Sequence, residues 1–168
     1  MQLKEIDKNR YRKHYKIIFA GIAFVLLVIA PATSALFISL FSNPEGSYLF
    51  HNMAGVLVGV AIITFLLNKF RHHPFMVEVV YVWDLKQQLN RIRRKQRKIE
   101  AAIEDNDKDA MIIMNFMLHG SKQLYELDDN TITMEDLMKK IQIHDERMQA
   151  AGLSSSTDSY NPALLERF

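Results

Sequence analysis

Six histidines are the residues of this sequence that most readily suggest metal chemistry. His72 and His73 are adjacent, and neighbouring positions on a regular helix cannot direct both imidazoles at one zinc ion. The other four fall in separate segments: His14, His51, His119 and His144. The sequence contains no cysteine, which excludes disulfides, thiolate metal sites and cysteine nucleophiles. We therefore interpret the histidines as structural or interfacial and expect no metal site.

Carboxylates gather in two short stretches, at residues 104 to 109 and 126 to 129. Both stretches fall where helices are expected to end, so turn formation and the helix dipole explain them, and neither has the spacing of a calcium loop. The sequence also lacks a phosphate-binding glycine loop, a nucleophile elbow and a zinc-protease helix. We expect a protein that is not an enzyme, with no catalytic residues and no cofactor.

A basic run is the third candidate for chemistry. Six of the eight residues from 91 to 98 are cationic: Arg91, Arg93, Arg94, Lys95, Arg97 and Lys98. Such a patch could neutralise phosphates, but no stacking aromatics are interleaved with it and an acidic run follows directly. We therefore expect no nucleic-acid partner. A solvated helix face, or contact with anionic lipid head groups or a protein partner, is the favoured interpretation.

Two long uncharged stretches predict a transmembrane hairpin over residues 17–68. This hairpin would anchor the segments that carry the charged residues described above. The first runs from Ile17 to Phe41, which at 1.5 Å per residue is about 37 Å of helix, enough to cross a hydrocarbon core of about 30 Å. The second runs from Leu49 to Leu67. The turn formers Pro44 and Gly46 lie between them, and a connection this short forces an antiparallel pair.

The distribution of basic residues sets the orientation. The N-terminal segment 1–16 holds six Lys and Arg against two acids, the connecting turn holds none, and basic residues resume at Lys69. By the positive-inside rule, both termini face the cytoplasm of a bacterial inner membrane. A cleavable signal peptide ending near Ala30-Pro31-Ala32 is disfavoured, because the apolar run continues to Phe41 and a second one follows.

Three residues within the spans predict how the helices pack. Pro31 lies near the middle of the first span and predicts a kink around residues 27 to 31, since it removes a backbone donor. Gly55 and Gly59 form a small-residue face that another helix can approach closely. The pattern leaves open whether this face forms a homodimer or seats the first span, through Ala35 and Ser39 or through Ala30 and Ser34.

The apolar pattern after Pro74 predicts that residues 75–149 form a cytoplasmic domain of about three helices. Its first helix carries an apolar stripe over residues 82–103, with alternating steps of three and four: Val82, Leu85, Leu89, Ile92, Gln96, Ile99 and Ile103. This heptad pattern suits a coiled coil between chains or a bundle within one chain. The bundle is favoured.

Local signals divide the remainder of this domain. Residues 105–108 predict a turn and helix cap, followed by a buried helix that continues to Leu127. Thr133 and Asp136 resemble a capping box for a third helix, with Ile132 and Leu137 placed as a hydrophobic staple. The tail, residues 153–168, begins with a Ser/Thr-rich run and is expected to be flexible.

The chain resembles a known family through its N-terminal MQLKEIDKNRYRKHYK, its paired spans, HHPFMVEVVYVW and LKQQLNRIRRK. That family, DUF3087, consists of small gammaproteobacterial membrane proteins of unknown function, and the resemblance implies an inner-membrane location and no activity. We expect a membrane-anchored interaction or scaffold module with an unknown protein partner or a second copy of itself. The alternative is a subunit of a small transporter or channel. A lipid-modifying enzyme using His72, His73 and Asp84 is disfavoured.

Overall fold

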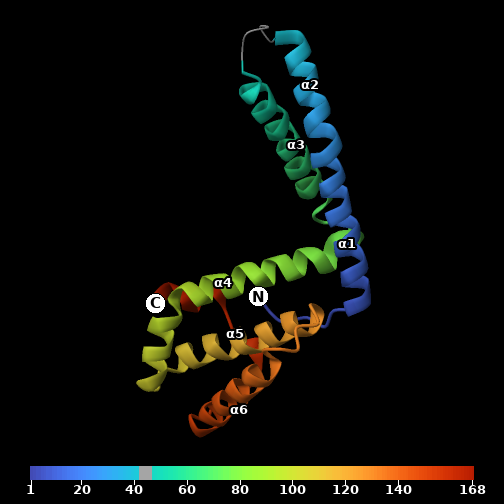
Figure 1. The fold of residues 1–168 in the computed structure, drawn as a ribbon. Helices are drawn as coiled ribbons and strands as arrows, with labels where there is room; N and C mark the ends of the chain where they lie inside the picture. Colours follow the sequence, from blue (N-terminus) through green and yellow to red (C-terminus); the bar gives the residue numbers. More distant parts are fainter. Residues whose placement is uncertain (42–46) are drawn as a thin grey trace. The chain divides into compact units, whose positions relative to one another are not determined.

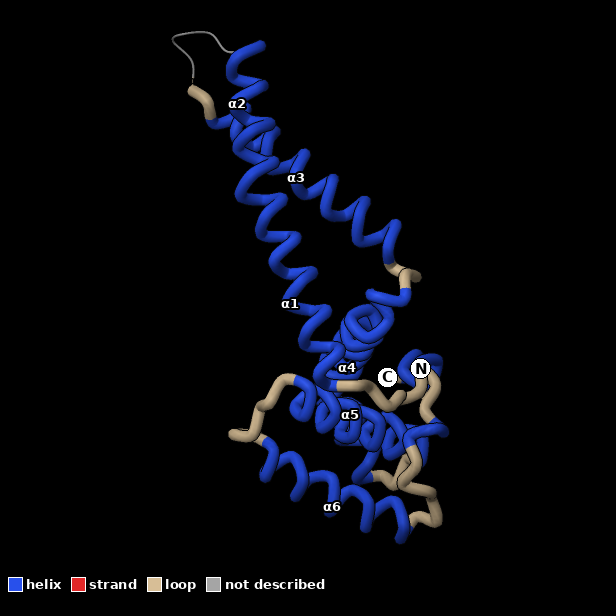
Figure 2. The backbone as a smooth tube through the Cα atoms, turned by 90° about the vertical axis from the view of Figure 1, so that its right-hand side faces the viewer, coloured by secondary structure: helices blue, strands red, loops and turns tan. Residues whose placement is uncertain are grey.

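The computed structural model describes residues 1–41 and 47–168, and these residues form helices and loops without a β-strand (Figure 2). The all-helical class predicted from the sequence is confirmed. Residues 9–80 form one compact unit, called here the apolar unit, and residues 1–8 with 81–168 form a second, called the helical domain. The helices are α1 (Lys8–Phe24), α2 (Ala30–Phe41), α3 (Leu49–Phe70), α4 (Val77–Glu104), α5 (Lys108–Leu127) and α6 (Met134–Ala150) (Figure 1).

The first apolar helix is longer than the uncharged stretch that predicts it. It runs without interruption from Lys8 to Phe41, because α1 and α2 are joined by the helical turn Val25–Ile29. Glycine and proline are absent between Lys8 and Ile17, so helix formation extends back through the basic residues. The predicted N-terminal segment is therefore divided: residues 1–7 are irregular and residues 8–16 are helical.

The turn joining α1 and α2 is a π-helix, and it lies directly before Pro31. The N–H of Ala30 donates to the carbonyl of Val25, five residues back. Proline has no N–H to donate, and its ring clashes with the preceding turn of an α-helix, so a widened turn accommodates it. The hydroxyl of Thr33 donates to the carbonyl of Ile29 at 2.8 Å. Where the sequence predicts a kink, around residues 27 to 31, the structure has a π-helical turn over Val25–Ile29.

The second apolar helix, α3, runs alongside α2 (Figure 1). It begins at Leu49, whose N–H donates to the side chain of Ser47 at 3.3 Å, and it ends at Phe70, three residues beyond the predicted span. The turn predicted from Ser42 to Ser47 lies outside the described residues except for Ser47 itself.

Both apolar helices expose large hydrophobic side chains, among them Leu27 (76% exposed) and Phe50 (77% exposed). In the most apolar stretch of each helix, only 17% and 11% of the residues are buried. A core helix of a soluble protein would be mostly buried. By length and composition, each of these two helices could cross a membrane.

The core of the helical domain is the apolar stripe of α4 against α5. Six of the seven predicted stripe residues are buried: Val82, Leu85, Leu89, Ile92, Ile99 and Ile103. Gln96, the polar member, is half-buried. Leu85 and Leu89 reach Gly120 of α5, where an added Cβ would lie 3.3 and 3.1 Å from their methyl groups. The stripe is therefore buried within one chain, and Gly120 allows the close approach rather than ending α5.

Asp107 caps α5 and lies within the turn and cap predicted at residues 105–108. Its carboxylate accepts the N–H of Ala110 at 2.9 Å, and this hydrogen bond, with Arg167 nearby, lowers the pKa of the Asp107 carboxyl below its ordinary value. The preceding residue, Asn106, has a φ of 60°, in the left-handed region that asparagine tolerates. The turn between α4 and α5 is thus fixed by local polar residues.

The capping box and staple predicted at the start of α6 are wrong. Thr133 does precede α6, but its side chain makes no capping hydrogen bond. Its φ of −101° and ψ of 2° lie outside the extended conformation from which a capping hydroxyl reaches back to the helix. Ile132 is 92% exposed while Leu137 is buried, so the two do not form a staple.

The C-terminal segment 153–168, expected to be flexible, is instead packed on α4 and α5. The ring of Tyr160 is buried and stacks on Phe116 of α5, with centroids 3.9 Å apart. The amide of Asn115 donates to the carbonyl of Ser155 at 3.0 Å. Two short 3₁₀ turns, Thr157–Ser159 and Pro162–Arg167, are capped by Ser156 and Asn161. The polar residues that suggested mobility serve as turn caps.

Hydrogen bonds also fix the N-terminal residues of the helical domain. The N–H of Lys4 donates to the hydroxyl of Tyr81 at 2.8 Å, and that hydroxyl donates to the side chain of Gln123 at 2.8 Å. The side-chain amide of Gln123 donates in turn to the carbonyl of Lys4. Burial raises the pKa of the Tyr81 phenol. These bonds hold residues 1–8 against α4 and α5.

Candidate functional site

Gly55 and Gly59, predicted to be a packing face, lie against α2 of the same chain. A Cβ added at Gly55 would lie 2.5 Å from the carbonyl oxygen of Ala30 and 2.8 Å from the Cβ of Ser34. At Gly59 the nearest atom would be the Cβ of Ala30, at 3.3 Å. The hydroxyl of Ser34 also bonds the side chain of Asn52. Of the two residue pairs that the sequence offers as the contact, the structure places Ala30 and Ser34 here, and Ala30 directly precedes Pro31.

The basic run on α4 is divided between several surfaces, since its residues point to different sides of the helix. Lys95 and Lys98 each donate at 2.6 Å to a main-chain oxygen of the C-terminal segment, that of Leu165 and of Phe168. Arg91 and Arg94, together with Lys95, line a cavity beside that segment. Arg93 and Arg97 are exposed. Two of the six predicted contact residues therefore hold the tail.

A groove lies between α4 and α6, with α5 as its floor. The floor is apolar and includes Met114, Met117 and Leu118. Arg93 of α4 and Lys140 of α6 line its rim, together with Glu104 and Arg147, which form an ion pair at 2.8 Å. The cavity volume is about 470 Å³. Beside the floor, Ile143 of α6 lines the groove and is 65% exposed.

His144 is a buried residue of the groove lining, and its ring nitrogen Nε2 lies 2.9 Å from the carbonyl oxygen of Met111. Burial lowers the pKa of the imidazole below its ordinary value of 6.5, against the opposing effects of the Met111 carbonyl and Asp145. Arg147 and His119 lower it further. The native state therefore favours neutral His144 at neutral pH.

This shift predicts that acid weakens the helical domain. Because the unfolded chain binds a proton at His144 more readily than the folded chain does, the free energy of unfolding falls as the pH drops below 6.5 toward the lower folded pKa. We expect His144→Gln to flatten this dependence and His72→Gln, at an exposed position, to leave it unchanged. Denaturant unfolding of the full chain in detergent between pH 5 and pH 8 measures the pH dependence of the free energy of unfolding. Equal slopes in all three proteins would contradict the assignment.

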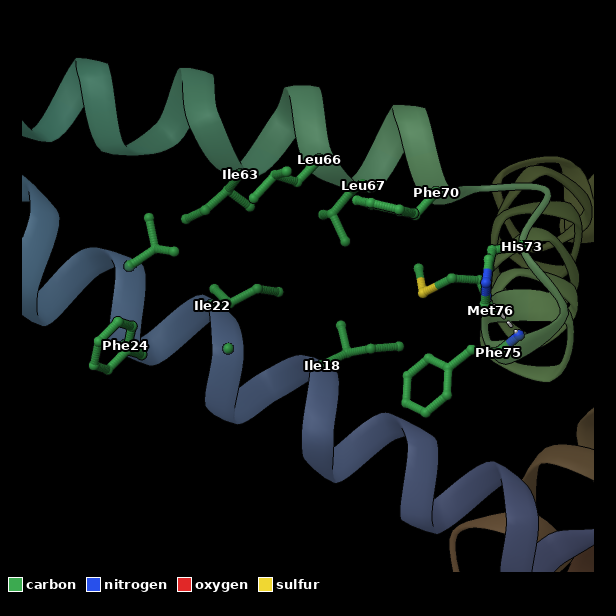
Figure 3. Close-up of a pocket in the computed structure, with 12 residues that line it drawn as sticks. Ile18, Ile22, Phe24, Ile63, Leu66, Leu67, Phe70, His73, Phe75 and Met76 are labelled. Atoms are coloured by element: carbon green, nitrogen blue, oxygen red, sulfur yellow. Dashed lines mark hydrogen bonds between the residues drawn. The ribbon is translucent and has the colours of Figure 1, made fainter.

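An apolar cleft lies between α1 and α3 in the apolar unit (Figure 3). Ile18 and Ile22 of α1 point across it toward Ile63 and Leu67 of α3. Its volume is about 520 Å³. The lining residues are Ile18, Gly21, Ile22, Phe24, Val25, Ile63, Leu66, Leu67, Phe70, His73, Phe75 and Met76. His73 is the one polar side chain among them, and its Nδ1 accepts the N–H of Phe75 at 3.2 Å.

A polar cluster around the buried Glu78 adjoins the end of this cleft. The ring of Phe75 contacts the ring of His14, with centroids 4.0 Å apart and the planes tilted by 31°. His14 Nδ1 lies 3.5 Å from one carboxylate oxygen of Glu78, and Arg10 Nε lies 2.8 Å from the other. Glu78 is 7% exposed. The cluster joins the first turns of α1 to the first turn of α4.

Sequence reasoning missed this cluster. Its signal is Glu78, the one charged residue in the stretch FMVEVVYVW before Asp84, because a carboxylate among apolar residues needs a cationic partner if it is buried. His14 and Arg10 precede it by more than sixty residues, so the pairing could not be inferred locally. Among the described residues, no group of three histidines or carboxylates could hold a metal ion.

Comparison with known proteins gives one match. No curated protein and no solved structure matches the chain. The model of one family matches nearly its whole length, residues 1–165, and that family is described as a protein of unknown function. The chain therefore belongs to the DUF3087 family.

Proposed function

We propose that this protein is a non-enzymatic interaction module anchored in the bacterial inner membrane by α1–α2 and α3. Support for the anchor comes from two helices of sufficient length, Lys8–Phe41 and Leu49–Phe70, whose large apolar side chains are exposed rather than buried. Exposed hydrophobic surface of this extent is costly in water and favourable in lipid.

The orientation has separate support. The Arg10–His14–Glu78 cluster holds the start of α1 beside the start of α4, so both ends of the helix pair emerge on one side. Six Lys and Arg in residues 1–16, with Lys69 in the last turn of α3 and Arg71 after it, support a cytoplasmic location for that side. The helical domain is then cytoplasmic.

The groove between α4 and α6 is the docking surface of this proposal. Its apolar floor and the exposed Ile143 suit the apolar face of an amphipathic helix. Glu104 and Arg147 already form a pair, and Glu100, the other acid in the lining, accepts the Gln96 amide at 2.7 Å. Arg93 and Lys140 are then the cations available to the occupant. We therefore expect a partner helix whose apolar stripe is flanked by carboxylates. The groove is the observation on which the interaction function rests.

Site-specific photocrosslinking in cells tests this proposal. A photoreactive residue at Ile143 is expected to give one discrete adduct, whereas the same residue at Ile132, an exposed isoleucine outside the groove, gives none. Arg93→Glu combined with Lys140→Glu is expected to reduce the Ile143 adduct by about tenfold, since like charges repel the partner's carboxylates. An adduct that survives charge reversal, or a strictly monomeric protein without adducts, would refute the docking surface.

A further inference from the structure

The cleft between α1 and α3 fits the acyl chain of a lipid, and we infer that it is a binding site for one anionic phospholipid. The inference rests on the membrane insertion proposed above, because only then does the cleft open onto hydrocarbon. Its volume of about 520 Å³ falls within the ~300–1,000 Å³ of typical small-ligand sites. The occupant must be apolar along its length and polar at one end, because His73 is the one polar side chain in the lining.

The residue sizes along α3 explain why the cleft exists. At Gly55 and Gly59 the missing side chains let α2 approach to contact. Further along α3 the residues facing α1 are large, including Ile63, Leu67 and Phe70, and the two helices diverge toward that end (Figure 2). Across from them, Gly21 of α1 leaves open space, since a Cβ added there would meet nothing within 4 Å. The protein's own side chains thus leave this volume unfilled.

The charges of the apolar unit determine which head group fits. Residues 9–80 contain six Lys and Arg and only two acids, Glu45 and Glu78. Glu78 is engaged by Arg10 and His14. Lys16 comes two residues before the lining residue Ile18, and Lys69 directly precedes the lining residue Phe70, so both lysines lie at the level of the end of the cleft that holds His73. Both are exposed, and the Lys69 ammonium lies over the Phe65 ring, 5.7 Å from its centroid. A phosphate without a compensating positive charge is the favoured head group.

Filling the cleft tests the site. Gly21→Leu places a side chain in the open space without a clash, and Ala20→Leu adds the same bulk at the exposed neighbouring position. Full-length protein is delipidated in detergent, offered mixed micelles containing phosphatidylglycerol and phosphatidylcholine, and examined by native mass spectrometry. We expect one bound phosphatidylglycerol in the wild type and in Ala20→Leu. Gly21→Leu should retain at least about tenfold less, since the side chain displaces several methylene groups.

A second variant separates the head group from the acyl chain. Lys16→Gln with Lys69→Gln is expected to abolish the preference for phosphatidylglycerol while total lipid binding persists. Equal lipid retention by Gly21→Leu and wild type would overturn the site. So would a lipid-free dimer, which would assign the cleft to a second copy of the chain. Carbonate extraction of native membranes distinguishes the two proposals: release of the protein refutes the anchor, whereas retention with no cleft-dependent lipid refutes only this site.

Discussion

Replacing Gly55 with leucine is expected to separate α3 from α2. An added Cβ would lie 2.5 Å from the Ala30 carbonyl oxygen and 2.9 Å from the Ser34 nitrogen, and backbone atoms cannot move aside as a flexible side chain can. Overpacking of this kind costs about 1–3 kcal/mol and more where rigid atoms collide. The contact between these helices is built on small residues, so a leucine at its centre must push the two backbones apart.

A disulfide crosslink measures the effect directly, since the natural chain has no cysteine. The side chains of Ser34 and Asn52 touch across the pair, so Ser34→Cys with Asn52→Cys is expected to form a disulfide under mild oxidation. Adding Gly55→Leu should reduce its yield at least about fivefold, within the range set by the overpacking cost. Val56→Leu, at an exposed neighbour on α3, should leave it unchanged. Equal yields in all three backgrounds would show that Gly55 does not determine the packing.

The same contact bears on the transport alternative. A channel or transporter subunit built through Gly55 and Gly59 would need this face to meet another chain. In the structure the face is filled by Ala30 and Ser34 of the same chain. The interaction module therefore requires no rearrangement of the helix pair, whereas a pore assembled through these glycines would.

Features that depend on residues close together in the chain could be predicted from the sequence. The two apolar helices follow from uncharged length, and the turn and cap at residues 105–108 follow from aspartate and asparagine shortly before an apolar run. The four-residue spacing of Gly55 and Gly59 predicts close helix packing, but it does not identify the helix that packs there. Three-dimensional contact was needed to select Ala30 and Ser34.

The C-terminal segment shows why the remainder could not be predicted. Its local sequence is polar and resembles a mobile tail, yet it is held by residues some forty to seventy positions away, including Asn115, Lys95 and Lys98. Long-range contacts outweigh local composition here. The capping box at Thr133 failed for the opposite reason, because a local pattern was present without the backbone conformation it requires.

The candidate sites depend even more on distant residues. Glu78 could have been singled out as a lone acid, but its partners Arg10 and His14 come from the start of the chain. The lipid cleft arises from the divergence of two helices, which depends on residue size at several positions of α3 at once. A residue pattern identifies which side chains are apolar, and only the packed structure identifies the space that they leave.

Phe116→Ala is expected to cause the second large effect, by releasing the C-terminal segment from the helical domain. Phe116 is fully buried, and its ring supports Tyr160 at a centroid distance of 3.9 Å. Truncating a buried phenylalanine costs about 3–5 kcal/mol through lost transfer energy and the cavity left behind. Denaturant unfolding of the full chain in detergent measures the loss, and hydrogen exchange at the Tyr160 and Leu164 amides reports release of the segment.

Tyr160→Phe is the matched control, because it removes the hydroxyl that bonds the Gln88 amide while keeping the stacked ring. We expect it to cost about 1–3 kcal/mol, since Gln88 is buried and would lose a partner, and to leave the exchange of the tail amides slow. The two variants separate the ring contact from the hydrogen bond. If Phe116→Ala lost less than Tyr160→Phe and kept the tail amides protected, the segment would be held by the Lys95 and Lys98 contacts rather than by its aromatic stack.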